Sequence, residues 1–178
     1  MQQQKTNIVL IGMPGSGKST VGVILAKMLA KSFLDTDILI QNCENRTLQD
    51  IVDQEGHMAL RTIEERVLLG ITCNHHIIAT GGSAAYSQPA MNHLKQQGIM
   101  VFLHADLPSL RKRISNYETR GLAKRPDQSF LDLFNERLTL YEKYCDITIP
   151  SSELNQEQVS QMVMSRLKSY ENENRSRL

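Results

Sequence analysis

The chain has 178 residues, and because 40% of them are hydrophobic, this length favours one domain with a substantial core. A formal net charge of +1, with no basic block, argues against nucleic acid or a polybasic membrane contact as partner. No apolar stretch approaches the roughly 18 residues of a membrane span. The three cysteines, Cys43, Cys73 and Cys145, form no CxxC pair and suggest neither a disulfide framework nor a zinc site. We therefore expect a cytoplasmic protein.

Short apolar runs alternate with longer amphipathic segments along the chain. The apolar runs predict strands at residues 7–12, 33–35, 76–80, 100–103 and 147–149. The amphipathic segments predict helices at residues 21–29, 47–55, 57–69, 89–96, 107–114, 129–144 and 156–170. This alternation predicts an α/β fold with a parallel sheet, in a single domain over residues 1–170, followed by a polar tail, 171–178. Ligands of such folds bind beyond the carboxyl ends of the strands.

The strongest functional signal is the segment GMPGSGKS, from Gly12 to Ser19, which matches G-x-x-x-x-G-K-[ST] between a predicted strand and a predicted helix. Its glycines let backbone N–H groups point into one hollow at the positive end of the helix. Lys18 is a point charge for the β- and γ-phosphates, and Ser19 offers a hydroxyl to Mg²⁺. The predicted ATP-binding residues of this segment are Gly15, Ser16, Gly17, Lys18, Ser19 and Thr20.

The loop alone does not separate a kinase from another ATPase, but no N-K-x-D base reader follows, which disfavours a GTPase. Asp35 and Asp37 end the second predicted strand, and side chains at i and i+2 of a strand point the same way. Asp35 could hold Mg²⁺ through water, and Asp37 could accept a proton from an acceptor hydroxyl or orient it. The alternative is that Asp37 only caps the next helix.

Two arginines are candidates for binding an anionic acceptor. Arg61 lies among apolar helix neighbours and needs a negative partner, which is either a substrate carboxylate or the nearby Glu64 or Glu65. Arg137 lies on the helix over 129–144, where a surface salt bridge is the alternative.

Glycines and a cationic loop complete the candidate site. Gly81 and Gly82 follow the third strand and permit close approach of a ligand, or else form a plain turn. Residues 116–128, with Arg120, Lys124 and Arg125, form an aperiodic cationic loop that is either a mobile lid over the phosphates or a solvated loop.

Taken together, these segments resemble the shikimate kinase family. The matching segments, over about residues 8–149, are GMPGSGKST, FLDTD, LRTIEE, ATGGS, the Arg125-Pro126 pair and ERLTLYEKY. The resemblance implies a three-layer α/β/α P-loop kinase with a five-stranded parallel sheet of order 2-3-1-4-5 and a mobile lid at about residues 116–128. It also implies transfer from ATP, with Mg²⁺, to shikimate, giving ADP and 3-phosphoshikimate in aromatic amino acid biosynthesis.

The resemblance also implies a role for each candidate residue. Lys18, Asp37 and Arg125 would be catalytic, with Arg125 beside the transferred phosphate, and Arg113 would pack against adenine. Ser19 and Asp35 would hold the metal, Asp35 from the second sphere. Shikimate would contact Asp37, Arg61, Gly82 and Arg137, with its carboxylate between the two arginines and Glu64 supporting them.

The sequence departs from the family pattern at four places. Ser83 replaces a third glycine, Leu60 replaces a common aromatic residue, the lid lacks leucines after its Arg-Pro pair, and no basic residue follows the last strand. Two other functions therefore stay open: a kinase of another small hydroxy acid such as gluconate, and a non-catalytic ATP-binding regulatory module. By analogy with small lidded kinases, we expect a monomer.

Overall fold

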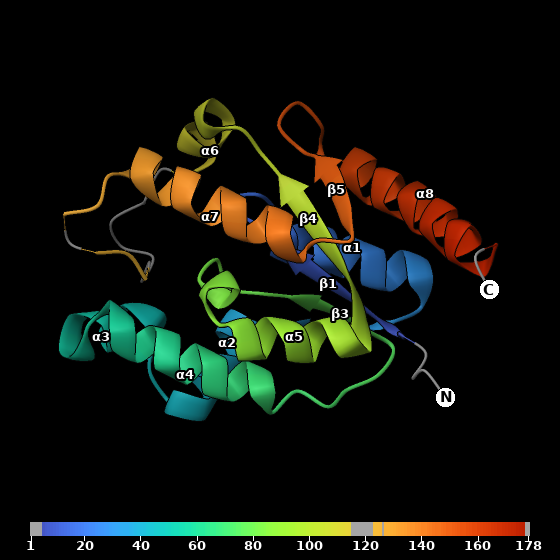
Figure 1. The fold of residues 1–178 in the computed structure, drawn as a ribbon. Coiled ribbons are helices and arrows are strands. Elements are labelled where there is room, and N and C mark those ends of the chain that lie inside the picture. The colour runs from blue at the N-terminus through green and yellow to red at the C-terminus, as the bar shows by residue number, and fades with distance from the viewer. Residues whose placement is uncertain (1–4, 115–122, 126, 177–178) are drawn as a thin grey trace.

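The computed structural model describes residues 5–114, 123–125 and 127–176 of the chain. Five strands pair in parallel in the order β2-β3-β1-β4-β5, and Figure 1 labels β3, β1, β4 and β5 of this sheet. They are β1 (Asn7–Ile11), β2 (Ser32–Asp35), β3 (His76–Ala79), β4 (Gly98–His104) and β5 (Ile147–Pro150). The predicted sheet and its implied strand order are confirmed.

Helices cover both faces of this sheet, which gives the three layers expected of strand–helix alternation. One face carries α1 (Lys18–Leu29) and α8 (Gln156–Arg175), which pack against each other. The other face carries α5 (Gln88–Gln97) and α7 (Phe130–Tyr144). Alternate residues of β1 therefore enter different cores: Val9 and Ile11 pack toward α5 and α7, whereas Ile8 and Leu10 pack toward α1 and α8.

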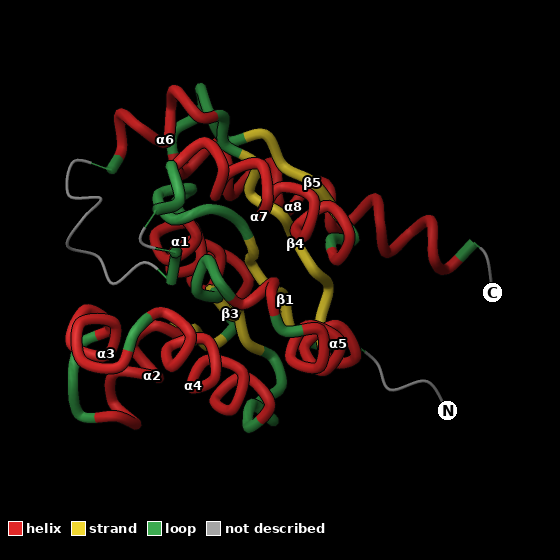
Figure 2. The backbone as a smooth tube through the Cα atoms, turned by 60° about the vertical axis from the view of Figure 1, so that its left-hand side comes forward, coloured by secondary structure: helices red, strands yellow, loops and turns green. Residues whose placement is uncertain are grey.

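Three further helices, α2 (Thr36–Glu44), α3 (Leu48–Glu55) and α4 (His57–Leu69), form a group beside the sheet, visible in Figures 1 and 2. A smaller buried cluster holds them together, made of Ile40, Ile51, Leu60, Ile63 and Ala123. Ala123 comes from the segment expected to form the lid, so this segment reaches into the helix group. Thr47 and Asp50 form a capping box at the start of α3.

The carboxyl ends of the strands meet at one edge of the sheet. Ile11 of β1 is level with Phe102 of β4, and Asp35 of β2 is level with Ala79 of β3. The glycine-rich loop, the start of α2 and the segment after β3 all leave from this edge. The fold therefore brings three separate candidate segments together, as expected for a parallel sheet.

Some elements differ from the sequence-based expectation. Helix α2 and the short 3₁₀ helix η1 (Ala84–Tyr86) were not predicted, and α8 continues to Arg175 instead of ending at residue 170. The extension of α8 follows from local bonding, since the Ser176 N–H still donates to Asn172. Residues 116–122 and 126 of the expected lid, including Arg120, lie outside the described residues. In the described part of the chain, no helix is long and apolar enough to cross a membrane.

Candidate active site

The loop between β1 and α1 forms a compact turn around the Lys18 side chain. Gly17, the residue before α1, adopts a φ of 96°, a left-handed conformation that favours glycine. The ammonium group of Lys18 donates to the carbonyl oxygens of Gly12 at 2.8 Å and Met13 at 2.9 Å. Burial lowers the pKa of Lys18 to about 8, although the carboxylates of Asp37, Asp35 and Glu64 oppose the shift. The ammonium is thus held inside the hollow where the sequence predicts phosphates.

Asp35 links the phosphate loop to the start of α2. Its Oδ2 accepts a hydrogen bond from the Ser19 hydroxyl at 2.6 Å, and its Oδ1 accepts from the backbone N–H groups of Asp37 and Ile38. Asp35 is therefore the residue that caps α2, a role the sequence analysis offered to Asp37 as the alternative. The prediction that both carboxylates project from one strand was wrong, because Asp37 is already in the first turn of α2.

Ser19 and Asp35 fit a magnesium ion chemically. The exposed Ser19 hydroxyl offers a hard oxygen ligand, and Asp35 is positioned to orient it from behind. Mg²⁺ in nucleotide sites takes few protein ligands and keeps several waters. Accordingly, no cluster of three or more histidine, cysteine, aspartate or glutamate side chains suited to a metal ion occurs among the described residues.

The Asp37 carboxylate is available for another role, because Asp35 and not Asp37 caps α2. Its carboxylate lines a cavity of about 490 Å³ that also exposes Lys18 and Arg137. Burial and the negative charge of Asp35 raise the pKa of Asp37, while Lys18 and Arg137 counteract the shift. A carboxylate with a raised pKa is better suited to accept a proton near neutral pH.

The guanidinium groups of Arg61 and Arg137 lie close together. Arg61, on α4, and Arg137, on α7, both donate through Nη2 to the carbonyl oxygen of Ala123, at 3.4 Å and 3.0 Å. Arg137 is only 1% exposed, yet neither arginine forms an ion pair within the described part of the chain. The Nε atoms of both are also buried without a hydrogen-bond partner among the described residues. A buried cation and a partly buried one therefore share one neutral oxygen, an arrangement that would favour an anion.

Glu64 and Glu65 were the alternative partners for Arg61, and Glu64 was the residue implied to support the arginine pair. Instead, Glu64 accepts a hydrogen bond from the Ser83 hydroxyl, and Glu65 accepts one from the Ser87 hydroxyl. Burial raises the pKa of Glu64 to about 7, partly offset by the Ser83 hydrogen bond. No hydrogen bond joins Glu64 to either arginine among the described residues, but its carboxyl interacts with both through charge, and its role in supporting them stays a prediction.

Gly82 lines the same cavity as Lys18 and Arg137. A methyl group in place of its hydrogen would come within 2.7 Å of Arg137 Nη1 and 2.8 Å of Pro14 Cδ. The Gly82 carbonyl accepts a 2.6 Å hydrogen bond from the hydroxyl of the buried Tyr141, which anchors this backbone to α7. Glycine is therefore required for the close packing of this backbone against Arg137 and Pro14, and its contact with a ligand stays a prediction.

The 490 Å³ cavity collects most of the predicted site. Its lining includes Gly15, Gly17, Lys18, Ser19, Thr20, Asp37, Gly82, Arg113 and Arg137. Ser16 is buried, with a hydroxyl that has no partner among the described residues. Arg61 lines a neighbouring cavity of about 290 Å³, which shares Glu64 and Ser83 with the first. The Glu64–Ser83 pair therefore lies between the two cavities.

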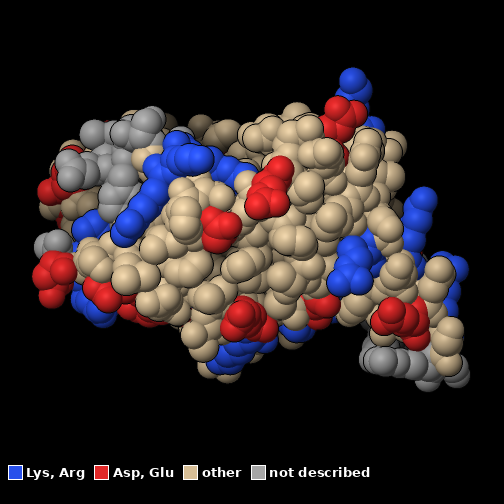
Figure 3. Space-filling model, turned by 90° about the horizontal axis from the view of Figure 1, so that it is seen from above, with Lys and Arg blue, Asp and Glu red and all other residues tan. Residues whose placement is uncertain are grey.

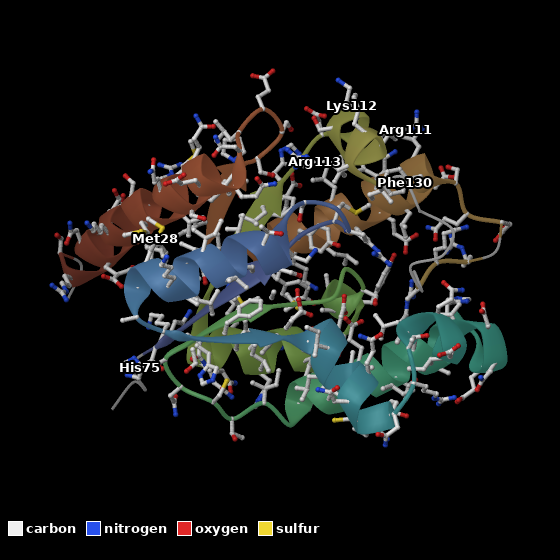
Figure 4. The ribbon with its side chains drawn as sticks, turned by 180° about the vertical axis from the view of Figure 1, so that it is seen from behind. Met28, His75, Arg111, Lys112, Arg113 and Phe130 are labelled. Atoms are coloured by element: carbon white, nitrogen blue, oxygen red, sulfur yellow. The ribbon has the colours of Figure 1, made fainter. Side chains whose placement is uncertain are left out.

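Helix α6 (Leu107–Arg113) adds a basic edge to the phosphate side of the cavity. Figure 4 shows Lys112 pointing outward and Arg113 turned toward the loop after β5, where its Nη2 donates to the carbonyls of Ser151 at 2.6 Å and Ser152 at 2.8 Å. Arg111, Lys112 and Arg113 are the basic residues of the last turn of α6, and Figure 3 shows Lys and Arg side chains gathered on the face seen from above. Arg113 thus has a defined position at the cavity rim, and its contact with adenine stays a prediction.

Arg125 is the one predicted catalytic residue that the structure does not bring to the cavity. Its guanidinium is 3.6 Å from Glu136, and its side chain is 58% exposed. A contact with the transferred phosphate would require this exposed ion pair to break. Surface ion pairs contribute little stability, so the predicted role would not demand much energy, but it stays a prediction.

Three functional contacts were not predicted from the sequence. They involve the Ala123 carbonyl on the two arginines, the Tyr141 hydroxyl on Gly82, and the ring of Tyr86, which lies against Arg61. Tyr141 belongs to the segment ERLTLYEKY, four residues after Arg137, so helical periodicity could have placed it on the same face. No local pattern signals the other two contacts.

Comparison with known proteins gives one consistent result. The family model described as shikimate kinase matches residues 14–168. A shikimate kinase from Sulfurihydrogenibium sp. (strain YO3AOP1) is 33% identical over 163 residues, covering 91% of this chain and 98% of its own. One from Rippkaea orientalis is 36% identical over 167 residues, covering 92% and 87%. The solved shikimate kinase from Acinetobacter baumannii in complex with shikimate superimposes with a TM-score of 0.86 at 32% identity, covering 92% and 93%.

Proposed function

Because the chain belongs to the shikimate kinase family, we propose that it transfers the γ-phosphoryl group of ATP to a hydroxyl group of shikimate. The observation that carries this proposal is the convergence of Arg61 and Arg137 on a single oxygen atom. Shikimate carries one carboxylate and several hydroxyl groups. A carboxylate could replace the neutral oxygen of Ala123 and give both guanidinium groups a charged partner.

The unpaired donors of the arginines support this choice of acceptor group. The Nε atoms of Arg61 and Arg137 are buried without partners among the described residues, and such orphaned donors are uncommon in a native structure. A carboxylate has two oxygens and about four lone-pair directions, so it can accept from both guanidinium groups at once. A neutral sugar hydroxyl would leave the buried charge of Arg137 and the partly buried charge of Arg61 without compensation.

ATP would bind on the other side of the cavity, at the loop formed by residues 12–19. The backbone amides at the start of α1 and the Lys18 ammonium would contact the phosphates, and Arg113 would lie beside the adenine. Ser19 would hold Mg²⁺ directly, with Asp35 orienting the Ser19 hydroxyl. When bound, the ion adds positive charge that stabilises the phosphate oxygens.

Asp37 would act between the two halves of the site. In the transfer step, the acceptor hydroxyl oxygen forms a bond to the γ-phosphorus, and the bond to the β–γ bridging oxygen breaks to release ADP. The hydroxyl proton passes to the Asp37 carboxylate, whose raised pKa suits it to receive a proton. Positioning and electrostatic stabilisation supply most of the acceleration, because this transition state is loose. Arg125 would add positive charge after leaving Glu136.

An acceptor panel tests the proposal. The purified chain is incubated with ATP and Mg²⁺, and ADP release is followed with shikimate, gluconate, a nucleoside monophosphate or no acceptor, with mass spectrometry of the product. We expect ADP release that depends on shikimate and yields phosphoshikimate. Turnover with gluconate alone would establish a different hydroxy-acid kinase, and ATP binding without transfer to any acceptor would favour the regulatory module.

The arginine variants then test the assigned binding mode. Arg61→Ala removes one of two charged hydrogen-bond donors and should raise KM for shikimate roughly 10- to 100-fold, with KM for ATP unchanged. Arg111→Ala, an exposed arginine of α6, is the matched control and should leave KM for shikimate unchanged. An unchanged KM for shikimate in Arg61→Ala would remove this residue from the acceptor site.

A further inference from the structure

A single aromatic ring lies under both arginines of the acceptor site. The ζ-carbon of Arg61 is 3.5 Å from the centroid of the Tyr86 ring, and the ζ-carbon of Arg137 is 5.4 Å from it. Both distances fall within the roughly 6 Å at which a guanidinium over a ring face is attracted by the ring quadrupole. Tyr86 therefore interacts with the whole arginine pair.

The ring is carried by a short, well-anchored element. Tyr86 ends η1, directly after the segment Gly81-Gly82-Ser83, and its backbone N–H donates to the Ser83 carbonyl at 3.0 Å. Helix η1 packs against α4 and α7, the two helices that carry Arg61 and Arg137. The next residue, Ser87, caps α5. The backbone under the ring is thus tied to the same elements as the arginines.

Arg61 depends on this ring more than Arg137 does. Arg137 is 1% exposed and is held by the surrounding core, whereas Arg61 is only partly buried on α4. Apart from the ring, the hydrogen-bonding contact of Arg61 in the described part of the chain is one 3.4 Å bond to Ala123. A guanidinium that lies flat on a ring keeps its N–H groups in a plane parallel to that ring. The ring therefore restricts the direction in which Arg61 presents its donors.

The ring also reduces the repulsion within the arginine pair. The two cations lie close together without an ion pair in the described part of the chain, and the negative face of an aromatic ring is attractive to both. Burial and the neighbouring Glu136 carboxylate raise the pKa of Tyr86, so the phenol is neutral at physiological pH. Its buried hydroxyl has no hydrogen-bond partner among the described residues. The contact between Tyr86 and Arg61 that the structure defines by a distance is the one made by the aromatic face, and Tyr86→Phe tests it without the hydroxyl.

We propose that Tyr86 is a positioning residue of the acceptor site: its ring fixes the plane of the Arg61 guanidinium and so sets the affinity for the acceptor carboxylate. The inference rests on the proposed function, because the carboxylate concerned is that of the acceptor. Tyr86 would thus contribute to acceptor affinity, although it lies on η1 and belongs neither to the phosphate loop nor to the charged groups of the site.

Steady-state kinetics of three variants test the inference. Tyr86→Leu removes the ring and should raise KM for shikimate by about 5- to 30-fold, with kcat and KM for ATP within about twofold of the parent. Tyr86→Phe keeps the ring and should keep the parent KM. Tyr170→Leu is the matched control, because this tyrosine packs on α8 against the core on the opposite face of the sheet. It should leave all three constants unchanged.

A double-mutant cycle separates positioning from a general loss of packing. If Tyr86 acts through Arg61, then Tyr86→Leu should have little further effect on KM in the Arg61→Ala background. Fully additive effects, or an unchanged KM in Tyr86→Leu, would overturn the inference. Loss of kcat and ATP affinity together in Tyr86→Leu, without rescue in Tyr86→Phe, would also overturn it, since a merely structural role has that result.

A measurement without acceptor distinguishes failure of this inference from failure of the proposed function. In protein with ¹³C,¹⁵N-labelled arginine, the Arg61 guanidinium signals, assigned with Arg61→Lys, should be shifted upfield by the ring. The shift should persist in Tyr86→Phe and vanish in Tyr86→Leu. If the parent chain does not phosphorylate shikimate, the proposed function fails, and this spectrum alone decides whether Tyr86 orients Arg61. An Arg61 signal that does not respond to Tyr86→Leu would overturn the inference in either case.

Discussion

Replacing Glu64 with glutamine should change how the stability of the protein depends on pH. Glu64 is 3% exposed, and burial raises its pKa to about 7 from an ordinary value of 4.5. Between these two pH values the folded protein holds a proton that the unfolded chain has lost. The free energy of unfolding must therefore fall as pH rises through this window.

The size of the effect follows from the difference between the two pKa values. At about 1.4 kcal/mol per pH unit, the buried carboxylate costs about 3 kcal/mol of stability once it is ionised, above pH 7. Below pH 4.5 the cost is absent, because the group is protonated in both states. Glutamine has a similar shape and does not ionise, so Glu64→Gln should gain about 3 kcal/mol relative to the parent between pH 4.5 and pH 8.

Urea unfolding of the parent and of Glu64→Gln at several pH values measures this difference directly. Ser83→Ala is an informative companion, because the Ser83 hydrogen bond lowers the pKa of Glu64. Loss of this hydrogen bond should raise the pKa of Glu64 further, so the fall in the free energy of unfolding should extend to higher pH. A stability difference between the parent and Glu64→Gln that stays constant from pH 4.5 to pH 8 would refute the reasoning.

Three further predictions concern the phosphate loop, the glycine pair and the proton acceptor. Burial lowers the pKa of Lys18 to about 8, so the side chain loses its charge as pH rises through that value. Above this pH, KM for ATP should rise by up to about tenfold per pH unit. Lys18→Arg should abolish this pH dependence of KM. Gly82→Ala places a methyl group 2.7 Å from Arg137 and should raise KM for shikimate and lower stability by about 1–3 kcal/mol, whereas Gly70→Ala, whose nearest contact would be 3.4 Å, should not affect KM. Asp37→Asn should lower kcat by roughly 100- to 10,000-fold without lowering the unfolding midpoint, because burial raises the pKa of the Asp37 carboxyl and the amide does not ionise; full turnover would exclude Asp37 as the proton acceptor.

The sequence alone predicted those parts of the fold and of the candidate site that depend on the local spacing of residues. The phosphate loop combines a fixed motif with a strand before it and a helix after it, and Lys18 and Ser19 lie where that context predicts. The parallel sheet followed from alternation of strands and helices. Asp37 was assigned to a strand because β2 has only four residues and runs directly into α2, so no change of periodicity marks the boundary.

Contacts between distant segments could not be read from local patterns. Arg61 and Ala123 are 62 positions apart, and the bond between them depends on how the segment before α7 packs against α2, α3 and α4. The Glu64 side chain turns toward Ser83, a residue that departs from the glycine of the family pattern, and no local pattern indicates this contact. Arg125 pairs with Glu136 for a similar reason: eleven positions separate them, and only the folded chain brings them together.

The Ala123 carbonyl has a consequence for ligand affinity. Since this oxygen already accepts from both arginines, it acts as an internal competitor for any incoming anion. The dissociation constant measured for an acceptor is then the intrinsic constant divided by the fraction of molecules in which the carbonyl has left the arginines. Small anions that make no other contacts, such as inorganic phosphate or chloride, lack the binding energy to displace it. This fraction is the same for every anion, so it leaves their relative affinities unchanged, but an acceptor that also engages Asp37 and Gly82 keeps enough affinity to occupy the site at concentrations at which small anions do not.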